Sequence, residues 1–194
     1  MSKINIDRIV KDIKSKTTSL TPVIEAVCNS IDAIGPERTD GVIDIIVKRT
    51  GQRSLNLDNA HTLSDIVSID IADNGIGFTE ENKDSFDTYR SGFKMSKGGK
   101  GFGRFMYLKY FNNVSIESVF CENDKYKQRS FTFGHADEII ENEQIIDIES
   151  NPDLHTGTVL HLSSIKSFDL DKGLEVIARK LVERLLVFFV TGGK

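Results

Sequence analysis

Cysteine is scarce in this sequence, which contains only Cys28 and Cys121 among 194 residues. Two cysteines so far apart exclude a disulfide framework and a CxxC zinc site, and they are typical of a reducing compartment. The 4 histidines have no metal-ligand spacing. We find neither a signal peptide nor an apolar run long enough to span a bilayer. We therefore expect a cytoplasmic protein without a membrane partner.

The overall charge and hydrophobic content are ordinary. The chain is 39% hydrophobic and 28% charged, with a net charge of −4. This composition predicts one globular domain with a substantial core and gives no overall signature of nucleic-acid binding. No repeat, low-complexity tract or linker divides the chain. Because the sequence ends abruptly at TGGK, we expect residues 1–194 to be a single N-terminal domain of a longer protein.

Hydrophobic periodicity predicts helices first and hairpin-like strands later. The expected helices cover 3–15, 22–34, 79–90, 102–112 and 171–190, and the expected strands cover 42–50, 66–73, 113–120, 128–135, 144–150 and 157–163. Ser19 or Thr21 is expected to cap the second helix, and Thr79 the third. This order predicts an α+β fold, a two-layer sandwich in which helices cover one face of a mixed, mostly antiparallel sheet.

The stretch EAVCNSIDA places three polar residues on one face of an otherwise apolar helix. Glu25, Asn29 and Asp32 fall within about 60° of each other around the helix axis. A helix this apolar is expected to be largely buried, and buried acids and amides cost free energy unless they have partners. The polar stripe therefore faces either solvent or a ligand, such as a metal ion with a water molecule.

Two further motifs lie at strand ends. In IADNGIGF, Asp73 ends a strand, and the glycines that follow allow a backbone to approach a ligand closely. An acid in this position can accept a hydrogen bond from a buried amino group, although a plain Asn-Gly turn also explains the motif. In HTGTVLHLS, Thr158 follows a glycine at the start of a strand, and a simple turn again explains the pair.

The stretch KGGKGFGR belongs to the most glycine-rich part of the chain. Five of the 15 glycines lie between Gly92 and Gly103, and residues 88–116 carry six basic residues and no acid. A glycine-rich loop that opens a helix offers N–H groups to anions, so a cationic island in an acidic domain predicts an anionic ligand. A flexible solvated loop is the alternative. The glycine spacing fits neither a P-loop nor a dinucleotide fingerprint.

In this order, the motifs ExxxNxxDA, DNGIG, GxGxG and GT resemble those of the GHKL superfamily of ATP-binding domains. That superfamily includes type II topoisomerase ATPase subunits, ninety-kilodalton heat-shock chaperones, MutL-type repair proteins, MORC-like ATPases and sensor histidine kinases. The resemblance runs from about Thr21 to Ser163 and is closest to the MutL, MORC and chaperone branches. It implies the histidine kinase-like ATPase type of sandwich, with ATP and Mg²⁺ as ligands.

The resemblance also implies roles for individual residues. Glu25 corresponds to the general base that activates water, Asn29 to the magnesium ligand, and Asp73 to the acid that reads the adenine amino group. The other implied nucleotide contacts are Asp32, Ala33, Gly75, Gly77, Lys94, Gly99, Lys100, Gly101, Phe102, Gly103 and Thr158. Residues 79–100 correspond to the mobile segment that covers ATP.

The implied function is ATP hydrolysis, slow in isolation, that gates homodimerisation or a conformational change of a larger protein. Glu25 is present and no helix with a phosphoacceptor histidine precedes it, which favours hydrolysis over histidine kinase-like phosphotransfer. Phosphotransfer to a protein remains one alternative. A non-catalytic module that binds a nucleotide or a nucleic acid is the other.

Overall fold

The computed structural model describes residues 6–13, 17–51, 63–87, 103–134, 138–152, 154–166 and 170–190. Its helices are α1 (Ile6–Asp12), α2 (Thr21–Ile34), α3 (Glu80–Asp87), α4 (Phe105–Tyr110) and α5 (Leu174–Val190). Its strands are β1 (Ile43–Arg49), β2 (Ile66–Asp73), β3 (Phe111–Glu122), β4 (Lys125–Phe133), β5 (Ile140–Ile148) and β6 (Gly157–Ile165). Each expected helix and strand has a counterpart, although several boundaries differ.

The strands form one open six-stranded sheet in the order β1-β2-β6-β3-β4-β5. Every pairing between neighbours in this sheet is antiparallel. The prediction of a mixed sheet was therefore wrong. A two-residue turn, Asn123 and Asp124, joins β3 to β4. The two residues adopt positive φ angles of 52° and 61°. Such two-residue turns connect antiparallel neighbours.

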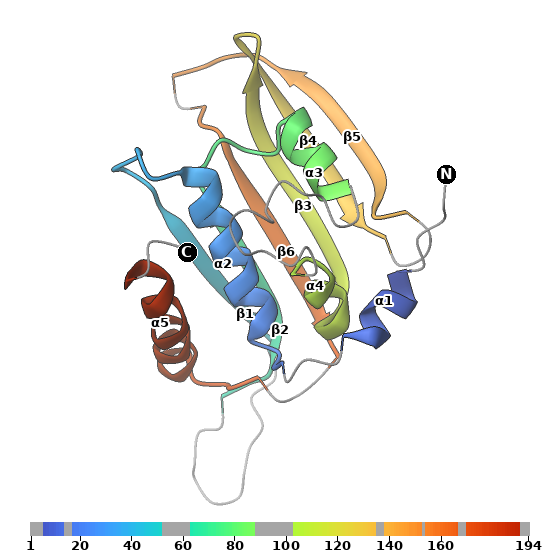
Figure 1. Ribbon diagram of the computed structural model, residues 1–194, viewed down its shortest axis with the longest axis vertical. Helices are drawn as coiled ribbons and strands as arrows, with labels where there is room; N and C mark the ends of the chain where they lie inside the picture. The colour runs from blue at the N-terminus through green and yellow to red at the C-terminus, as the bar shows by residue number, and fades with distance from the viewer. Residues whose placement is uncertain are drawn as a thin grey trace, which may run out of the picture.

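Helices α2, α3 and α4 cover one face of the sheet, and α5 lies beside α2 near the β1 edge (Figure 1). The apolar side chains of the central strands point into this layer, for example Ile69 and Ile71 of β2 and Leu162 of β6. They pack with buried residues of α2 such as Val23 and Val27. The predicted α+β arrangement, with helices over one face of the sheet, is thus confirmed.

The ends of α2 are set by backbone geometry. The expected cap from Ser19 or Thr21 was wrong, because Leu20 is the N-cap residue and no side chain bonds to the helix start. Ser19 is buried instead, and the Thr21 hydroxyl accepts a hydrogen bond from the Thr18 N–H at 3.0 Å. The helix ends at Ile34, and Gly35 follows as the C-cap residue with a φ of +77°, which suits glycine.

The start of α3 follows the prediction, whereas the end of α4 does not. Thr79 caps α3, because its hydroxyl oxygen accepts a hydrogen bond from the Asn82 N–H at 3.2 Å. Helix α4 stops at Tyr110, two residues before the predicted end, because Phe111 is extended and fully buried as the first residue of β3. Strand β3, in the interior of the sheet, therefore begins directly after α4.

Candidate nucleotide site

Asp73 lies at the end of β2, where the sheet meets α2. It is opposite Thr158 of β6 in the strand register. Its carboxylate accepts hydrogen bonds from the Ser30 hydroxyl at 2.8 Å and from the Gly75 N–H at 2.9 Å. Burial raises the pKa of Asp73 above its ordinary value, although the bonds from Ser30, Gly75 and the Thr158 backbone oppose this shift. A half-buried carboxylate can accept further hydrogen bonds, including one from an amino group.

The glycine turn after Asp73 packs directly on the end of α2. A Cβ atom on Gly75 would lie 2.8 Å from the carbonyl carbon of Ala33, and the Ile76 N–H donates to the Ala33 carbonyl at 3.1 Å. Gly77 has a φ of +79°, and a Cβ there would lie 2.2 Å from the Val119 carbonyl oxygen. Both glycines are therefore required by close backbone contacts, which fix the turn beside Asp73.

Ser118 connects Thr158 to this turn. Its hydroxyl donates to the Gly157 carbonyl at 2.8 Å and accepts from the Phe78 N–H at 2.8 Å. The Ser118 and Thr158 hydroxyl oxygens lie 3.1 Å apart. Because Ser118 gives its single proton to Gly157, Thr158 donates to Ser118 and keeps its own lone pairs as acceptors. No sequence motif pointed to Ser118, which lies inside an ordinary strand pattern.

Two other predicted residues of α2, Glu25 and Asn29, lie against α4 and the residues just before it. A Cβ atom on Gly103 would lie 2.2 Å from Glu25 Oε2, so the Glu25 carboxylate lies against the Gly103 backbone. Asn29 is exposed, and its side-chain amide donates to the Tyr107 hydroxyl at 3.1 Å. Burial raises the pKa of Tyr107 above its ordinary value, and the nearby charge of Glu25 raises it further. Glu25, Asn29, Gly103 and Tyr107 thus form one cluster.

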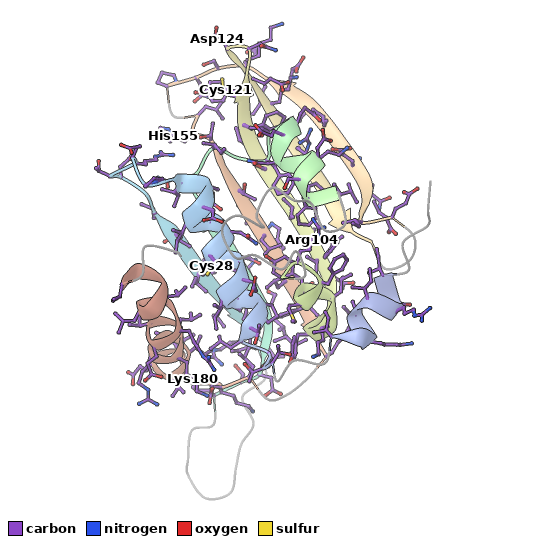
Figure 2. The ribbon with its side chains drawn as sticks, in the orientation of Figure 1. Cys28, Arg104, Cys121, Asp124, His155 and Lys180 are labelled. Carbon is purple, nitrogen blue, oxygen red and sulfur yellow. The ribbon has the colours of Figure 1, made fainter. Side chains whose placement is uncertain are left out.

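Arg104 joins the start of α4 to the end of α3 (Figure 2). Its guanidinium donates to the carbonyls of Ser85, at 3.1 Å, and of Phe86. Its Cζ atom lies 5.3 Å from the ring centroids of both Phe86 and Phe105. A cation suits this position because helix-terminal carbonyls carry partial negative charge. Arg104 therefore sets the position of the backbone that follows Gly103, next to Glu25.

Two residue groups of the predicted site are thus arranged along α2. In the C-terminal half of α2, Ser30 bonds to Asp73 and Ala33 contacts Gly75. In the N-terminal half, Glu25 contacts Gly103. Asp32 is exposed on the same helix. The predicted contacts Lys94, Gly99, Lys100, Gly101 and Phe102 lie outside the described residues, as does most of the segment 79–100.

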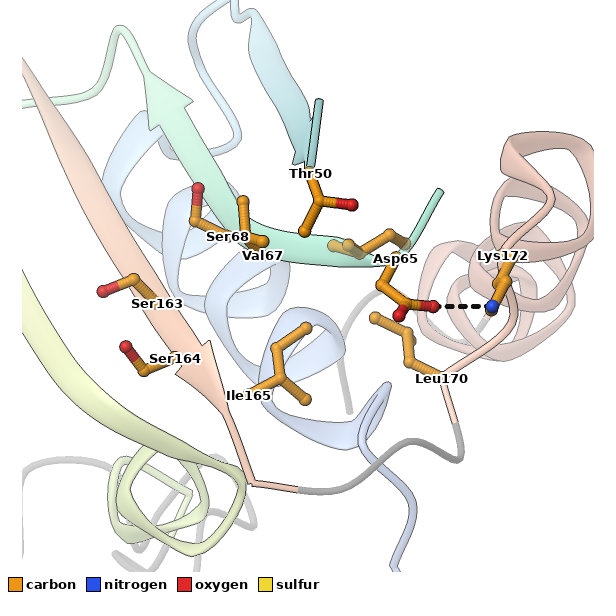
Figure 3. Close-up of a pocket in the computed structure, with 10 residues that line it drawn as sticks. Thr50, Asp65, Val67, Ser68, Ser163, Ser164, Ile165, Leu170 and Lys172 are labelled. Carbon is orange, nitrogen blue, oxygen red and sulfur yellow. Dashed lines mark ion pairs between the residues drawn. The ribbon is translucent and has the colours of Figure 1, made fainter. Parts of the chain in front are cut away.

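A separate depression lies near the first residues of β2, at the opposite end of this strand from Asp73 (Figure 3). Its volume is about 850 Å³, and Thr50, Ser68 and Ser163 contribute hydroxyl groups to its wall. The acid in its wall, Asp65, is paired with Lys172 at 2.6 Å. None of the predicted nucleotide contacts that the structure describes lines this depression.

The donor groups of the site suit magnesium better than a transition metal. In the described part of the chain, no group of three or more His, Cys, Asp or Glu residues could hold a metal ion. Magnesium prefers oxygen ligands, keeps several waters, and is commonly held by one or two protein oxygens together with substrate phosphates. An exposed asparagine amide beside a carboxylate fits this requirement.

Similarity to known proteins gives no further assignment. No protein-family model matches the chain, and no curated protein matches it. Among the described helices, none is both long and apolar enough to cross a bilayer. Any functional assignment therefore depends on the residues of the site themselves.

Proposed function

We propose that this chain is a GHKL-type domain that binds ATP with Mg²⁺ and hydrolyses it. One observation carries the proposal: α2 contacts the Asp73 turn through Ser30 and Ala33, and contacts Gly103 through Glu25. From Glu25 to Ala33 the helix rises about 12 Å. A single rigid element thus aligns a carboxylate suited to a base amino group with a second carboxylate beside the glycine-rich stretch.

In this proposal Asp73 accepts a hydrogen bond from the adenine amino group, and Thr158 accepts one through a water molecule. Backbone N–H groups of the glycine-rich stretch that ends at Gly103 bind the phosphates. Asn29 supplies an oxygen to Mg²⁺, which neutralises phosphate charge when bound. Hydrolysis of a phosphoanhydride depends mostly on such positioning and charge neutralisation.

Glu25 acts as the general base. A water molecule attacks the γ-phosphorus, its proton passes to the Glu25 carboxylate, and the bond to the β-γ bridging oxygen breaks to release ADP and phosphate. The contact between Glu25 and Gly103 supports this role, because Gly103 ends the stretch proposed to bind the phosphates. Geometry of this kind is the first requirement for a general base.

The binding half of the proposal is tested by calorimetry with a non-hydrolysable ATP analogue, with and without Mg²⁺. Wild type should bind, and Asp73→Asn should lose most of the affinity because the amide presents a donor where the adenine amino group needs an acceptor. Asp70→Asn is the matched control, because Asp70 lies on the same strand but pairs with Lys48 and His161. Equal affinity of all three proteins would rule out adenine recognition by Asp73.

The catalytic half is tested by phosphate release from ATP. Glu25→Ala should abolish turnover and leave analogue binding intact, because the carboxylate acts on water rather than on the nucleotide. Loss of binding instead would assign Glu25 a structural role. Transfer of radiolabel from ATP to a protein, with little release of free phosphate, would indicate that the domain is a phosphotransferase and not an ATPase. Salt-sensitive DNA binding that ATP does not affect would favour a nucleic-acid module.

A further inference from the structure

Tyr107 is a buried phenol that contacts an exposed residue of the candidate site. The Tyr107 side chain is on α4 and only 2% exposed, whereas Asn29 is exposed on α2. Asn29 Nδ2 donates to the phenol oxygen at 3.1 Å. An asparagine amide has a donor end and an acceptor end of nearly equal shape. Because Nδ2 is bonded to the phenol, the amide oxygen Oδ1 points away from the phenol.

The phenol also lies close to Glu25, whose negative charge acts on it. In its contact with Asn29 the phenol oxygen is the acceptor, so the phenol proton points away from the amide. The lone pairs of the phenol oxygen therefore face Asn29, and only the NH₂ end of the amide can donate to them. The rotated amide would place two oxygens against each other.

We propose that Tyr107 is a positioning residue that holds the Asn29 amide with Oδ1 presented to Mg²⁺. The inference rests on the proposed function, since it concerns the metal that accompanies ATP. Mg²⁺ binds oxygen and demands strict geometry, so an amide that rotates would present NH₂ to the cation part of the time. Residues that orient a metal ligand typically change metal affinity by 10–100-fold when they are replaced.

Tyr110 provides a matched control on the same helix. It is also buried, at 7% exposure, and its hydroxyl lies 2.7 Å from the Thr17 hydroxyl. Tyr110→Phe therefore removes one phenol hydrogen bond from α4, as Tyr107→Phe does, but removes it from a contact with Thr17. Both substitutions keep the aromatic ring, which for Tyr107 packs against Phe133 with centroids 6.5 Å apart.

The experiment is calorimetry of a non-hydrolysable ATP analogue as a function of Mg²⁺ concentration. Without Mg²⁺, wild type, Tyr107→Phe and Tyr110→Phe should bind the analogue equally. With Mg²⁺, Tyr107→Phe should lose about 10-fold or more of the gain in affinity, whereas Tyr110→Phe should retain it. An unchanged Mg²⁺ dependence in Tyr107→Phe would overturn the inference while leaving ATP binding in place. Absence of analogue binding by wild type would remove the proposed function and the inference together.

A second variant separates orientation from a general structural effect. Asn29→Asp presents an oxygen at both ends of the side chain, so the Mg²⁺ dependence should no longer need the phenol. Adding Tyr107→Phe to Asn29→Asp should then change the Mg²⁺ dependence little. An equal loss in both backgrounds would show that the phenol acts by another route.

Discussion

Asp70 and Asp73 lie three residues apart on β2, on opposite faces of the sheet, and their carboxyl pKa values shift in opposite directions. Burial acts to raise the Asp70 pKa, but hydrogen bonds from Lys48 at 2.6 Å and His161 at 3.0 Å outweigh it and lower the pKa overall. For Asp73, burial outweighs its hydrogen bonds and raises the pKa. The ionised carboxylate of Asp70 therefore stabilises the folded state, whereas the ionised carboxylate of Asp73 destabilises it.

The first prediction is that the Asp73→Asn protein is as stable as wild type or more stable at pH 7, although its affinity for ATP is lost. A raised folded-state pKa means that the folded protein binds the proton more tightly than the unfolded chain does. The ionised form therefore costs stability above the raised pKa, and this cost disappears as the pH falls towards the ordinary value of about 3.9. Thermal unfolding from pH 4 to 7, together with calorimetry, measures both effects. A marked drop in the unfolding midpoint at pH 7 would contradict the prediction.

The second prediction has the opposite sign. The lowered pKa of Asp70 means that its pairing with Lys48 and His161 stabilises the fold above the ordinary carboxyl pKa, and that this contribution is lost as the pH falls through the folded-state value. Asp70→Asn should lower the unfolding midpoint at pH 7 and reduce the acid-side slope of stability against pH. Affinity for the ATP analogue should not change. An acid-side slope equal to that of wild type would assign the acid sensitivity to other groups.

The third prediction concerns Gly103→Ala. The added methyl group would meet Glu25 Oε2 at 2.2 Å, and this atom is the end of a flexible side chain. The carboxylate should move rather than the backbone, so the free energy of unfolding should change by less than about 1 kcal/mol. Phosphate release should fall about 100-fold, since small misplacements of a catalytic group have effects of this size.

Gly51→Ala is the control for Gly103→Ala, because no atom of the described residues other than its chain neighbours lies within 4 Å of a Cβ atom on Gly51. It should leave both stability and turnover unchanged. If Gly103→Ala hydrolyses ATP at the wild-type rate, the position of the Glu25 carboxylate is not critical, and its role as the general base would be in doubt.

Helical spacing was sufficient to place Glu25, Asn29 and Asp32 on one face of a helix, but it could not say what stands opposite them. The side-chain donor to Asp73 from α2 is Ser30, which lies on the buried side of this helix among apolar residues. Tyr107 belongs to a run of mostly aromatic and aliphatic residues, so the sequence predicted only a helix there. Both partners are set by tertiary packing, which local patterns do not encode.

The strands were predictable from alternation, whereas their order was not. β6 lies between β2 and β3, so Thr158 meets Asp73 across 84 residues of intervening chain. Strand propensity describes how a segment fits a sheet and does not specify which neighbour it pairs with. The position of Thr158 beside Asp73 was expected only from the family resemblance.

The last prediction concerns Arg129, a fully buried arginine on β4 that fixes the start of α3. Its guanidinium donates to the carbonyls of Phe78 at 2.6 Å and Thr79 at 3.0 Å, and it pairs with Glu80 and with Glu143 at 3.0 Å. Arg129→Met should lower the free energy of unfolding by about 3–5 kcal/mol, because it leaves buried acceptors without their donor. Chemical denaturation measures this loss.

Arg129→Lys and Lys127→Met distinguish the geometry of the arginine from its charge. Lysine keeps the positive charge but lacks the planar fork that reaches two carbonyls and two carboxylates at once, so Arg129→Lys should recover only part of the loss. Lys127 lies on the same strand and pairs with Glu122 at 2.8 Å, but it is partly exposed. Lys127→Met should therefore cost far less than Arg129→Met. Full recovery by lysine would show that charge alone holds the start of α3, and that the contacts to Phe78 and Thr79 add little.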